Sequence, residues 1–147
     1  MSQPFRLIIA GSREFTHPKW REFLTHALTM FAESFEVDLA NVELFSGGCR
    51  GIDMHGEDIA RERGWTVRRF EPDWAQHGKA AGPMRNQAML DAGADGCIIA
   101  RLDDSRGSRD MQRRAEPEVP TLALVMDRED ENGNHFDEAE GRWVGPA

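Results

Sequence analysis

The feature that most constrains the fold is a regular alternation of short apolar runs with helical segments along the first 126 residues. The runs are rich in Ile, Val, Leu and Phe and have the length of buried β-strands. Five such runs cover residues 5–10, 42–45, 65–70, 97–100 and 120–125. Strands that alternate with helices are typical of parallel sheets with helices on both faces. The sequence therefore predicts an α/β fold with a mostly parallel five-stranded sheet.

The segments between these runs carry signals of helices. Between residues 18 and 35, apolar side chains recur at intervals of three and four, which predicts an amphipathic helix with a wide apolar stripe. Gly64 stands where a left-handed residue commonly ends a helix. We expect the stretch 71–81, with its Pro and Gly, to be irregular. The expected helices span residues 18–35, 52–63, 84–92 and 108–115.

The charge is distributed unevenly. The chain has a net charge of −8, and residues 127–147, with seven acids and two bases, account for −5 of it. We expect a domain over residues 1–126 followed by an acidic tail over 127–147, with a turn signal at 132–134. The tail adds an edge strand or stays mobile, and the sequence leaves both open. An acidic balance disfavours broad nucleic-acid binding, because a phosphate backbone requires a basic surface.

Composition also limits the compartment and the chemistry. Cys49 and Cys97 lie far apart, which predicts free thiols in a reducing compartment. No run approaches the ~20 apolar residues that span a bilayer, and the start of the chain shows no secretory signal. The expected location is the cytoplasm, without a membrane partner. The five histidines lack the spacing of metal ligands, so we expect no metal and no other cofactor.

Ligands of open parallel sheets bind at the carboxyl ends of the strands, so the loops that follow the strands carry the candidate site. After the first strand, Gly11 permits a tight turn, Ser12 offers a hydroxyl and Arg13 can clamp an anion. The loop after the second strand favours an anion through backbone N–H groups and a helix start, although a simple tight turn remains the alternative. Its small residues are Ser46, Gly47, Gly48 and Gly51.

The third loop, residues 73–86, is longer and more polar than a plain connection requires. Arg85 and Asn86 fall in the first turn of the expected helix, where a cation opposes the helix dipole. Arg85 therefore answers either a bound anion or an internal carboxylate such as Asp73 or Asp53.

The fourth loop contains a second helix start. Gly107 precedes Ser108, a good N-cap, which gives another candidate anion site. Asp103 and Asp104 hold a ribose hydroxyl or are solvated, and we expect solvation for one of them. Four polar loops at one edge of a sheet together indicate a binding site.

The order of these loops resembles a known family. The motifs are G-S-R (11–13), S-G-G-C-R-G-I-D (46–53), D-W-A-Q-H-G-K-A-A-G-P-M-R-N (73–86) and S-R-G-S-R-D-M (105–111). They resemble the YspA-like, YpsA-related members of the SLOG superfamily, which includes relatives of the DNA-processing protein DprA and of LOG, a phosphoribohydrolase. The resemblance covers residues 5–125. It implies a single Rossmann-like, doubly wound domain that binds a nucleotide or nucleotide-derived small molecule, as a sensor or a nucleotide-processing domain. Homodimers are common in that superfamily.

By the same resemblance, a definite set of residues would line the ligand site. They are Gly11, Ser12, Arg13, Ser46, Gly47, Gly48, Gly51, Arg85, Asn86, Gly107 and Ser108.

Two alternatives follow from the relatives. The LOG enzymes cleave an N-glycosidic bond with the Glu of P-G-G-x-G-T-x-x-E, and the matching position here is His55. If this chain is such a hydrolase, Asp53 is the first candidate for the catalytic carboxylate and Glu57 the second. The other alternative is DprA-like binding of single-stranded DNA. We place it below a small ligand, because aromatic residues for base stacking are sparse and acids accompany Arg61 and Arg63 on the same helix.

Overall fold

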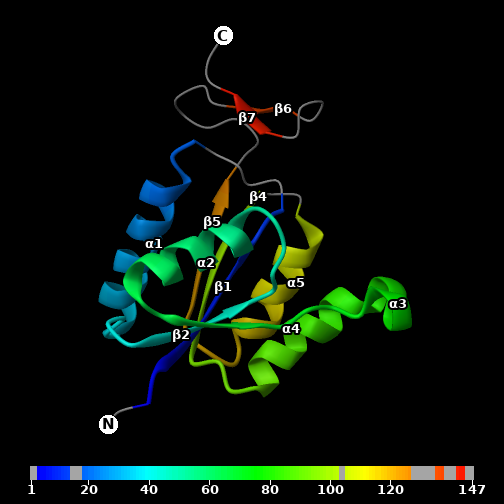
Figure 1. The fold of residues 1–147 in the computed structure, drawn as a ribbon, viewed down its shortest axis with the longest axis horizontal. Coiled ribbons are helices and arrows are strands. Elements are labelled where there is room, and N and C mark those ends of the chain that lie inside the picture. The colour runs from blue at the N-terminus through cyan, green and yellow to red at the C-terminus, as the bar shows by residue number, and fades with distance from the viewer. Residues whose placement is uncertain (1–2, 14–17, 103–104, 127–134, 138–141, 145–147) are drawn as a thin grey trace.

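In the computed structural model, residues 3–13, 18–102, 105–126, 135–137 and 142–144 are described, the last two ranges as backbone alone. The five predicted strands form one all-parallel sheet in the order β3-β2-β1-β4-β5 (Figure 1). Their bounds are β1 Phe5–Gly11, β2 Val42–Ser46, β3 Thr66–Arg69, β4 Gly96–Leu102 and β5 Thr121–Met126. The predicted α/β fold is thereby confirmed.

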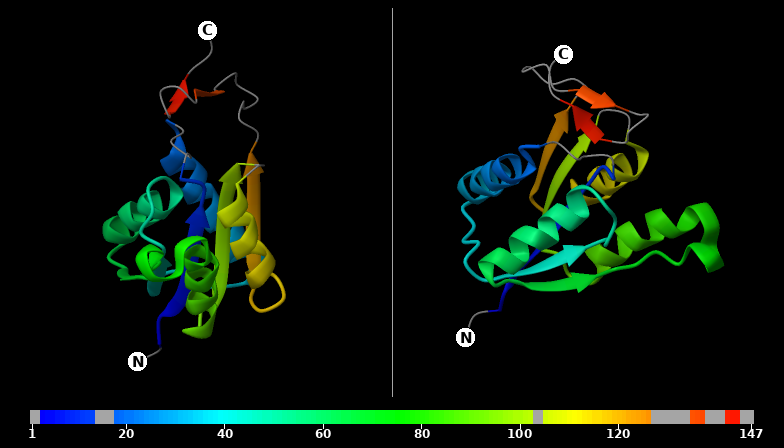
Figure 2. Two further views of the ribbon diagram at one scale, coloured as in Figure 1. Left: turned by 90° about the vertical axis from the view of Figure 1, so that its right-hand side faces the viewer. Right: turned by 45° about the horizontal axis from the view of Figure 1, so that its top comes forward.

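Helices cover both faces of the sheet because alternate strand residues point to opposite sides. Leu7 and Ile9 of β1 pack in the core with α1 (Trp20–Phe35) and α2 (Ile52–Arg63). Ile8 and Ala10 pack in the second core with α4 (Ala81–Asp91) and α5 (Arg106–Ala115). The two helical layers are visible on either side of the sheet in Figure 2. None of the helices within the described ranges has the length and apolar character to cross a bilayer.

The stretch after β3 is more regular than expected. It contains α3 (Trp74–His77) and a 3₁₀ turn (Gly78–Ala80) that leads directly into α4. The expectation of an irregular segment and a helix start at residue 84 is wrong. Asp73 caps α3 by accepting the Gln76 N–H at 3.1 Å, and Pro83 lies in the first turn of α4, where no intrahelical donor is lost.

This helical arm projects beyond the sheet (Figures 1 and 2). Residues 73–80 are all exposed. Because α4 begins at Ala81, Arg85 and Asn86 lie in its second turn, and the argument from a first-turn cation does not apply.

The start of α5 also differs from the expectation. The helix begins at Arg106, so that Ser105 occupies the N-cap position and Ser108 lies in the first turn. Ser105 has an extended backbone (φ −74°, ψ 108°), which is the conformation that an N-cap residue needs. Ser108 does not cap; its Oγ lies 3.1 Å from Ser105 Oγ.

Two further strands, β6 (His135–Asp137) and β7 (Arg142–Val144), pair antiparallel with each other. They form a separate ribbon and do not extend the five-stranded sheet. The rest of the expected acidic tail lies outside the described residues, as do Asp103 and Asp104. The domain division after residue 126 stays a prediction.

Candidate ligand-binding cleft

A cleft of about 700 Å³ opens at the carboxyl edge of the sheet, where the loops after β1 and β4 meet the N-terminal ends of α2 and α5. At this edge β2 and β3 lie on one side of β1, whereas β4 and β5 lie on the other. Open α/β sheets bind ligands at such a switch point. The volume lies within the range of small-molecule sites.

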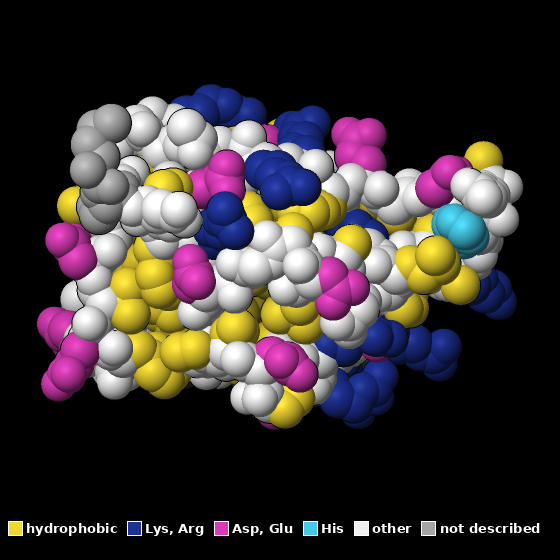
Figure 3. Space-filling model, turned by 90° about the horizontal axis from the view of Figure 1, so that it is seen from below, with side chains coloured by type: hydrophobic (Ala, Val, Ile, Leu, Met, Phe, Trp, Pro, Cys, Tyr) yellow, Lys and Arg dark blue, Asp and Glu magenta, His cyan; other side chains and the backbone are white. Residues whose placement is uncertain are grey.

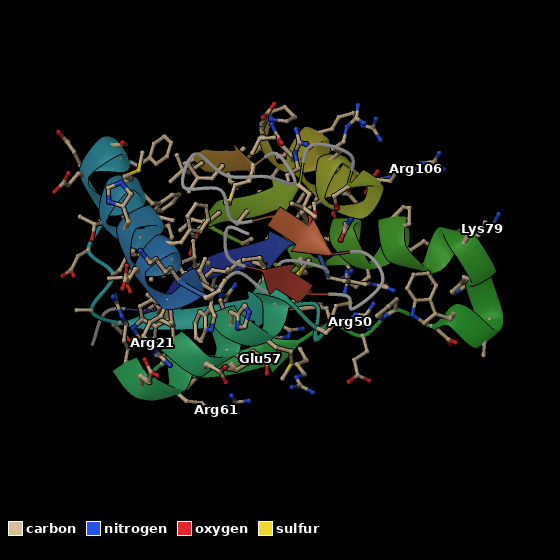
Figure 4. The ribbon with its side chains drawn as sticks, turned by 90° about the horizontal axis from the view of Figure 1, so that it is seen from above. Arg21, Arg50, Glu57, Arg61, Lys79 and Arg106 are labelled. Carbon is tan, nitrogen blue, oxygen red and sulfur yellow. The ribbon has the colours of Figure 1, made fainter. Side chains whose placement is uncertain are left out.

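The cleft is cationic although the whole chain has a net charge of −8. Five of its described lining residues are basic, Arg13, Arg50, Lys79, Arg85 and Arg106, and two are acidic, Asp53 and Asp110. Figure 4, viewed from above, shows Arg106 at the start of α5, Arg50 before α2 and Lys79 on the projecting arm. Cations gathered in one cleft raise the local concentration of an anionic ligand.

The residues predicted from the sequence fall into two groups. Those that line the cleft are Gly11, Ser12, Arg13, Asp53, Arg85, Asn86, Gly107 and Ser108. The described residues that line it do not include Ser46, Gly47, Gly48, Gly51 or Glu57. Residues of the second group contact residues that line the cleft: the Gly47 carbonyl accepts from Arg85, and Gly51 packs against the backbone of Ser12 and Arg13.

The loop between β2 and α2 uses its own side chains to satisfy its backbone. The Gly48 N–H donates to Ser46 Oγ at 3.1 Å, and the Cys49 N–H donates to Asp53 Oδ2 at 3.3 Å. The expectation was that these donors would face a bound anion. In the structure, the anion at the start of α2 is the carboxylate of Asp53.

Two glycines of this loop stand where close neighbours leave little room for a Cβ. Gly51 precedes α2 with φ +79°, and a Cβ on it would overlap the carbonyl oxygen of Ser12 and lie 2.6 Å from that of Arg13. A Cβ on Gly47 would overlap Nη1 of Arg85. These glycines therefore let the loop approach the backbone of the first loop and the guanidinium of the third.

Asp53 combines burial with access to the cleft, since its side chain lines the cleft while the residue is only 4% exposed. Burial raises the pKa of Asp53 to about 6, against the charge of Arg85 and the backbone donors of Cys49 and Gly11, which lower it. Arg85 thus acts electrostatically on Asp53, an internal carboxylate. The sequence left open whether Arg85 faces such a carboxylate or a bound anion. A buried titratable group with a shifted pKa is typical of functional sites, although structural networks produce such shifts too.

Arg85 and Asn86 connect the β2–α2 loop to α5. Arg85 Nη1 donates to the Gly47 carbonyl at 3.0 Å, and Arg85 Nε donates to Asn86 Oδ1 at 3.0 Å. Asn86 Nδ2 in turn donates to Asp110 Oδ2 at 3.0 Å and to the Gly107 carbonyl at 3.3 Å. This chain of hydrogen bonds fixes the distance between the two walls of the cleft.

The first turn of α5, residues 106–108, forms the wall opposite α2. Ser105 makes no side-chain cap hydrogen bond in this helix. The N–H groups and the positive dipole end of a helix start favour an anion. On the next turn, burial raises the pKa of Asp110, but hydrogen bonds from Arg114 and Asn86 outweigh it and hold the pKa below its usual value.

Glu57, the second candidate carboxylate, is 1% exposed and is held by ion pairs outside the cleft. Ser46 Oγ donates to its Oε2 at 2.7 Å, Arg69 Nη2 donates to Oε1 at 2.7 Å, and Arg61 Nη2 donates to Oε1 at 3.3 Å. Burial raises the pKa of Glu57, but these donors outweigh burial and lower it. Glu57 therefore ties α2 to β2 and β3.

Among the charged and aromatic side chains that line the cleft, sequence reasoning did not select five: Arg50, Trp74, Lys79, Arg106 and Asp110. All five belong to the loops that the sequence singled out, but none was selected there as a site residue. For Trp74 a signal was available, because this aromatic residue stands in a polar loop outside any apolar stripe. Its exposure depends on the arm, which the sequence did not predict.

The two cysteines differ in position, since Cys49 lines the cleft and Cys97 is buried. Cys49 and Cys97 are both free thiols, as predicted, and burial strongly raises the pKa of Cys97. Within the part of the chain that the structure describes, no three His, Cys, Asp or Glu side chains are grouped so that they could hold a metal ion. The lining donors are suited to an anion.

Comparison with known proteins identifies one family. The model of the YspA, cpYpsA-related SLOG family matches residues 5–77. The Gene 61 protein of Mycobacterium phage D29 is 32% identical over 120 residues, which cover 76% of this chain and 88% of that protein. No solved structure is significantly similar to the chain.

Proposed function

Because the chain belongs to the YspA, cpYpsA-related SLOG family, we propose that its cleft binds a nucleotide or a nucleotide-derived small molecule. The family suggests a nucleotide-related Rossmann-like domain, and the proposal specifies the site. The observation that carries it is the convergence of five cationic side chains and one helix start on a single cleft of about 700 Å³.

The proposed phosphate position is the first turn of α5. Arg106 and the N–H groups of residues 106–108 stand on one side of the cleft, and Arg50 stands on the other. A phosphate between them would receive charge-assisted hydrogen bonds and favour the positive end of the helix. Asp53 lies at the α2 side, where its carboxylate can accept a hydrogen bond from a sugar hydroxyl.

Binding is tested by calorimetric titration and thermal shift with AMP, ADP-ribose, NAD and cyclic AMP. At least one of these ligands is expected to bind and to stabilise the protein. The double variant Arg50→Gln/Arg106→Gln is expected to weaken that binding at least about tenfold, because each lost charge-assisted hydrogen bond contributes more than 1 kcal/mol. Both side chains are exposed, so their loss is expected to leave the fold intact.

The matched control is Arg63→Gln/Arg68→Gln, which removes the same charge from exposed positions outside the cleft. It is expected to bind like the wild type. If both double variants bind equally weakly, the loss of affinity comes from the change in net charge and not from contacts in the cleft. If none of the four ligands binds the wild type, the proposal is refuted.

The location of Asp53 favours a second candidate, hydrolysis of an N-glycosidic bond. In that reaction the base leaves, a ribosyl centre of oxocarbenium character develops, and water adds to it. The Asp53 carboxylate would stabilise the developing positive charge, while Arg85 and the start of α5 hold the phosphate. Burial raises the pKa of Asp53, and the positive charge of Arg85 opposes this rise, which favours the ionised carboxylate.

This candidate predicts slow release of free base from nucleoside monophosphates, measured by chromatography. Asp53→Asn is expected to lower the rate by about 10²-fold or more, the size of a lost acid–base or charge-stabilising group. Asp58→Asn, the same change at a half-buried position on the same helix outside the cleft, serves as the control. Release that persists unchanged in Asp53→Asn would clear Asp53 of the role.

Several basic side chains that could contact DNA are engaged within the protein. Arg61 and Arg69 bind Glu57, and Arg113 and Arg114 bind Asp110. On the face shown in Figure 3, Lys and Arg side chains stand in separate groups, several of them beside acidic ones. These observations support placing single-stranded DNA below a small ligand.

A further inference from the structure

Trp74 is an unusual residue to leave at the surface. It begins α3 on the projecting arm and is 48% exposed. The large hydrophobic side chains that stand exposed in the described ranges are Phe35, Trp74, Met84 and Val125. Of these four, Trp74 is the one that lines the cleft. Its exposure therefore presents an aromatic surface to the same space as the cationic side chains.

The indole lies close to two neighbours from other segments. The guanidinium carbon of Arg13, at the end of β1, lies 5.6 Å from the centre of the indole ring. On α4, a Cβ added to Gly82 would contact the indole edge at 3.4 Å, so the ring rests against a position without a side chain. The indole thus lies between Arg13 and Gly82, with part of its surface open.

An indole whose surface is partly open to the cleft has a defined chemistry. Its π face attracts flat, electron-poor partners, and the planar guanidinium of Arg13 is one such partner. A purine or another nucleobase is a second, since stacking on an aromatic side chain requires only a π face. Cationic side chains such as those that line the cleft attract phosphate, but charge alone does not distinguish a nucleotide from a sugar phosphate.

We propose that Trp74 holds the base of the ligand by stacking, so that the cleft selects nucleotides over sugar phosphates that lack a base. This inference rests on the proposed binding function and extends it. The ligand then lies with its phosphate at the start of α5 and its base against the arm. Trp74 is the specificity-determining residue, and the arm positions it.

The test compares AMP with ribose 5-phosphate, which has the same sugar and phosphate without the base. In the wild type, AMP is expected to bind more tightly. Trp74→Leu is expected to weaken AMP roughly ten- to hundredfold, the contribution of one stacked base, and to leave ribose 5-phosphate unchanged. Trp74→Phe keeps a ring and is expected to retain most of the affinity for AMP.

Fluorescence gives a readout that a purely structural role would not change. AMP is expected to quench wild-type tryptophan emission, and this quenching should be lost in Trp74→Phe even though AMP still binds. Met84→Ala is the control, because Met84 is an equally exposed apolar residue of the adjoining helix outside the cleft, at 49%. It is expected to match the wild type with both ligands.

Three results would overturn the inference alone. The first is AMP binding that Trp74→Leu leaves unchanged, and the second is an equal loss of AMP and ribose 5-phosphate binding in that variant. The third is equal affinity of the wild type for both ligands. If the wild type binds neither these probes nor the nucleotides named above, the proposed function fails and the inference fails with it.

Discussion

Gly51→Ala is expected to destabilise the protein by about 3 kcal/mol or more, which corresponds to a fall in Tm of about 10 °C. Gly51 has φ +79° and ψ −131°, a conformation that residues with a Cβ rarely adopt. An added Cβ would also overlap the carbonyl oxygen of Ser12. Backbone atoms cannot move aside as a flexible side chain can, so strain and overlap add.

The same substitution is expected to weaken ligand binding, because it displaces the backbone of Ser12 and Arg13, which line the cleft. Urea denaturation measures the stability, and calorimetry measures the binding. Gly64→Ala is the matched control. Gly64 also has a positive φ, +72°, but no atom lies within 4 Å of its added Cβ. It should cost only about 1 kcal/mol and leave binding unchanged; equal losses in the two variants would contradict the packing argument.

The unliganded Asp53→Asn variant is expected to gain stability relative to the wild type as the pH rises from 4 to 7.5. Burial raises the pKa of Asp53 to about 6 in the folded chain, from 3.8. The folded state therefore binds this proton more tightly than the unfolded state does. The stabilisation from protonated Asp53 is complete below pH 4 and is lost as the pH rises through about 6, a change on the order of 3 kcal/mol.

Urea denaturation of the wild type and Asp53→Asn at pH 4, 6 and 7.5 measures this difference. The asparagine keeps an oxygen that accepts the Cys49 N–H and does not titrate. Subtracting the two curves removes the titration of the groups that do not interact with Asp53. A stability difference between wild type and Asp53→Asn that does not change with pH would contradict the raised pKa.

Glu57, one turn further along α2, is expected to have the opposite linkage. Its pKa is lowered because the donors from Arg69, Ser46 and Arg61 outweigh the effect of burial. Its contribution is thus present above the unfolded pKa and is lost as the pH falls through the folded one. The same helix therefore carries two carboxylates with opposite effects. Ionised Glu57 stabilises the fold, whereas ionised Asp53, which faces the cleft, lowers the free energy of unfolding. Such a loss of stability is typical of functional sites.

Local sequence signals were sufficient for the sheet and the main helices. The apolar runs predicted all five strands, and Gly64 marked the end of α2, where the structure has φ +72°. Strands and helix ends depend on residues that are neighbours in sequence, so the local sequence is enough to predict them. The predicted start of α4 at residue 84 is wrong because Pro83 already lies inside the first turn of the helix, and Asp73 caps a helical arm ten residues before Pro83.

The sequence by itself determined which loops would meet at the carboxyl edge, because parallel strands bring their ends together. Only the tertiary structure decided what each residue does there. Burial raises the pKa of Asp53 against the charge of Arg85, which is distant in the chain and lowers it. The donors of the glycine loop face Asp53 and Ser46. Trp74 enters the cleft because the arm brings it beside Arg13 and Gly82. Burial, charge and close approach are properties of residues brought together from several loops, and no one loop contains them.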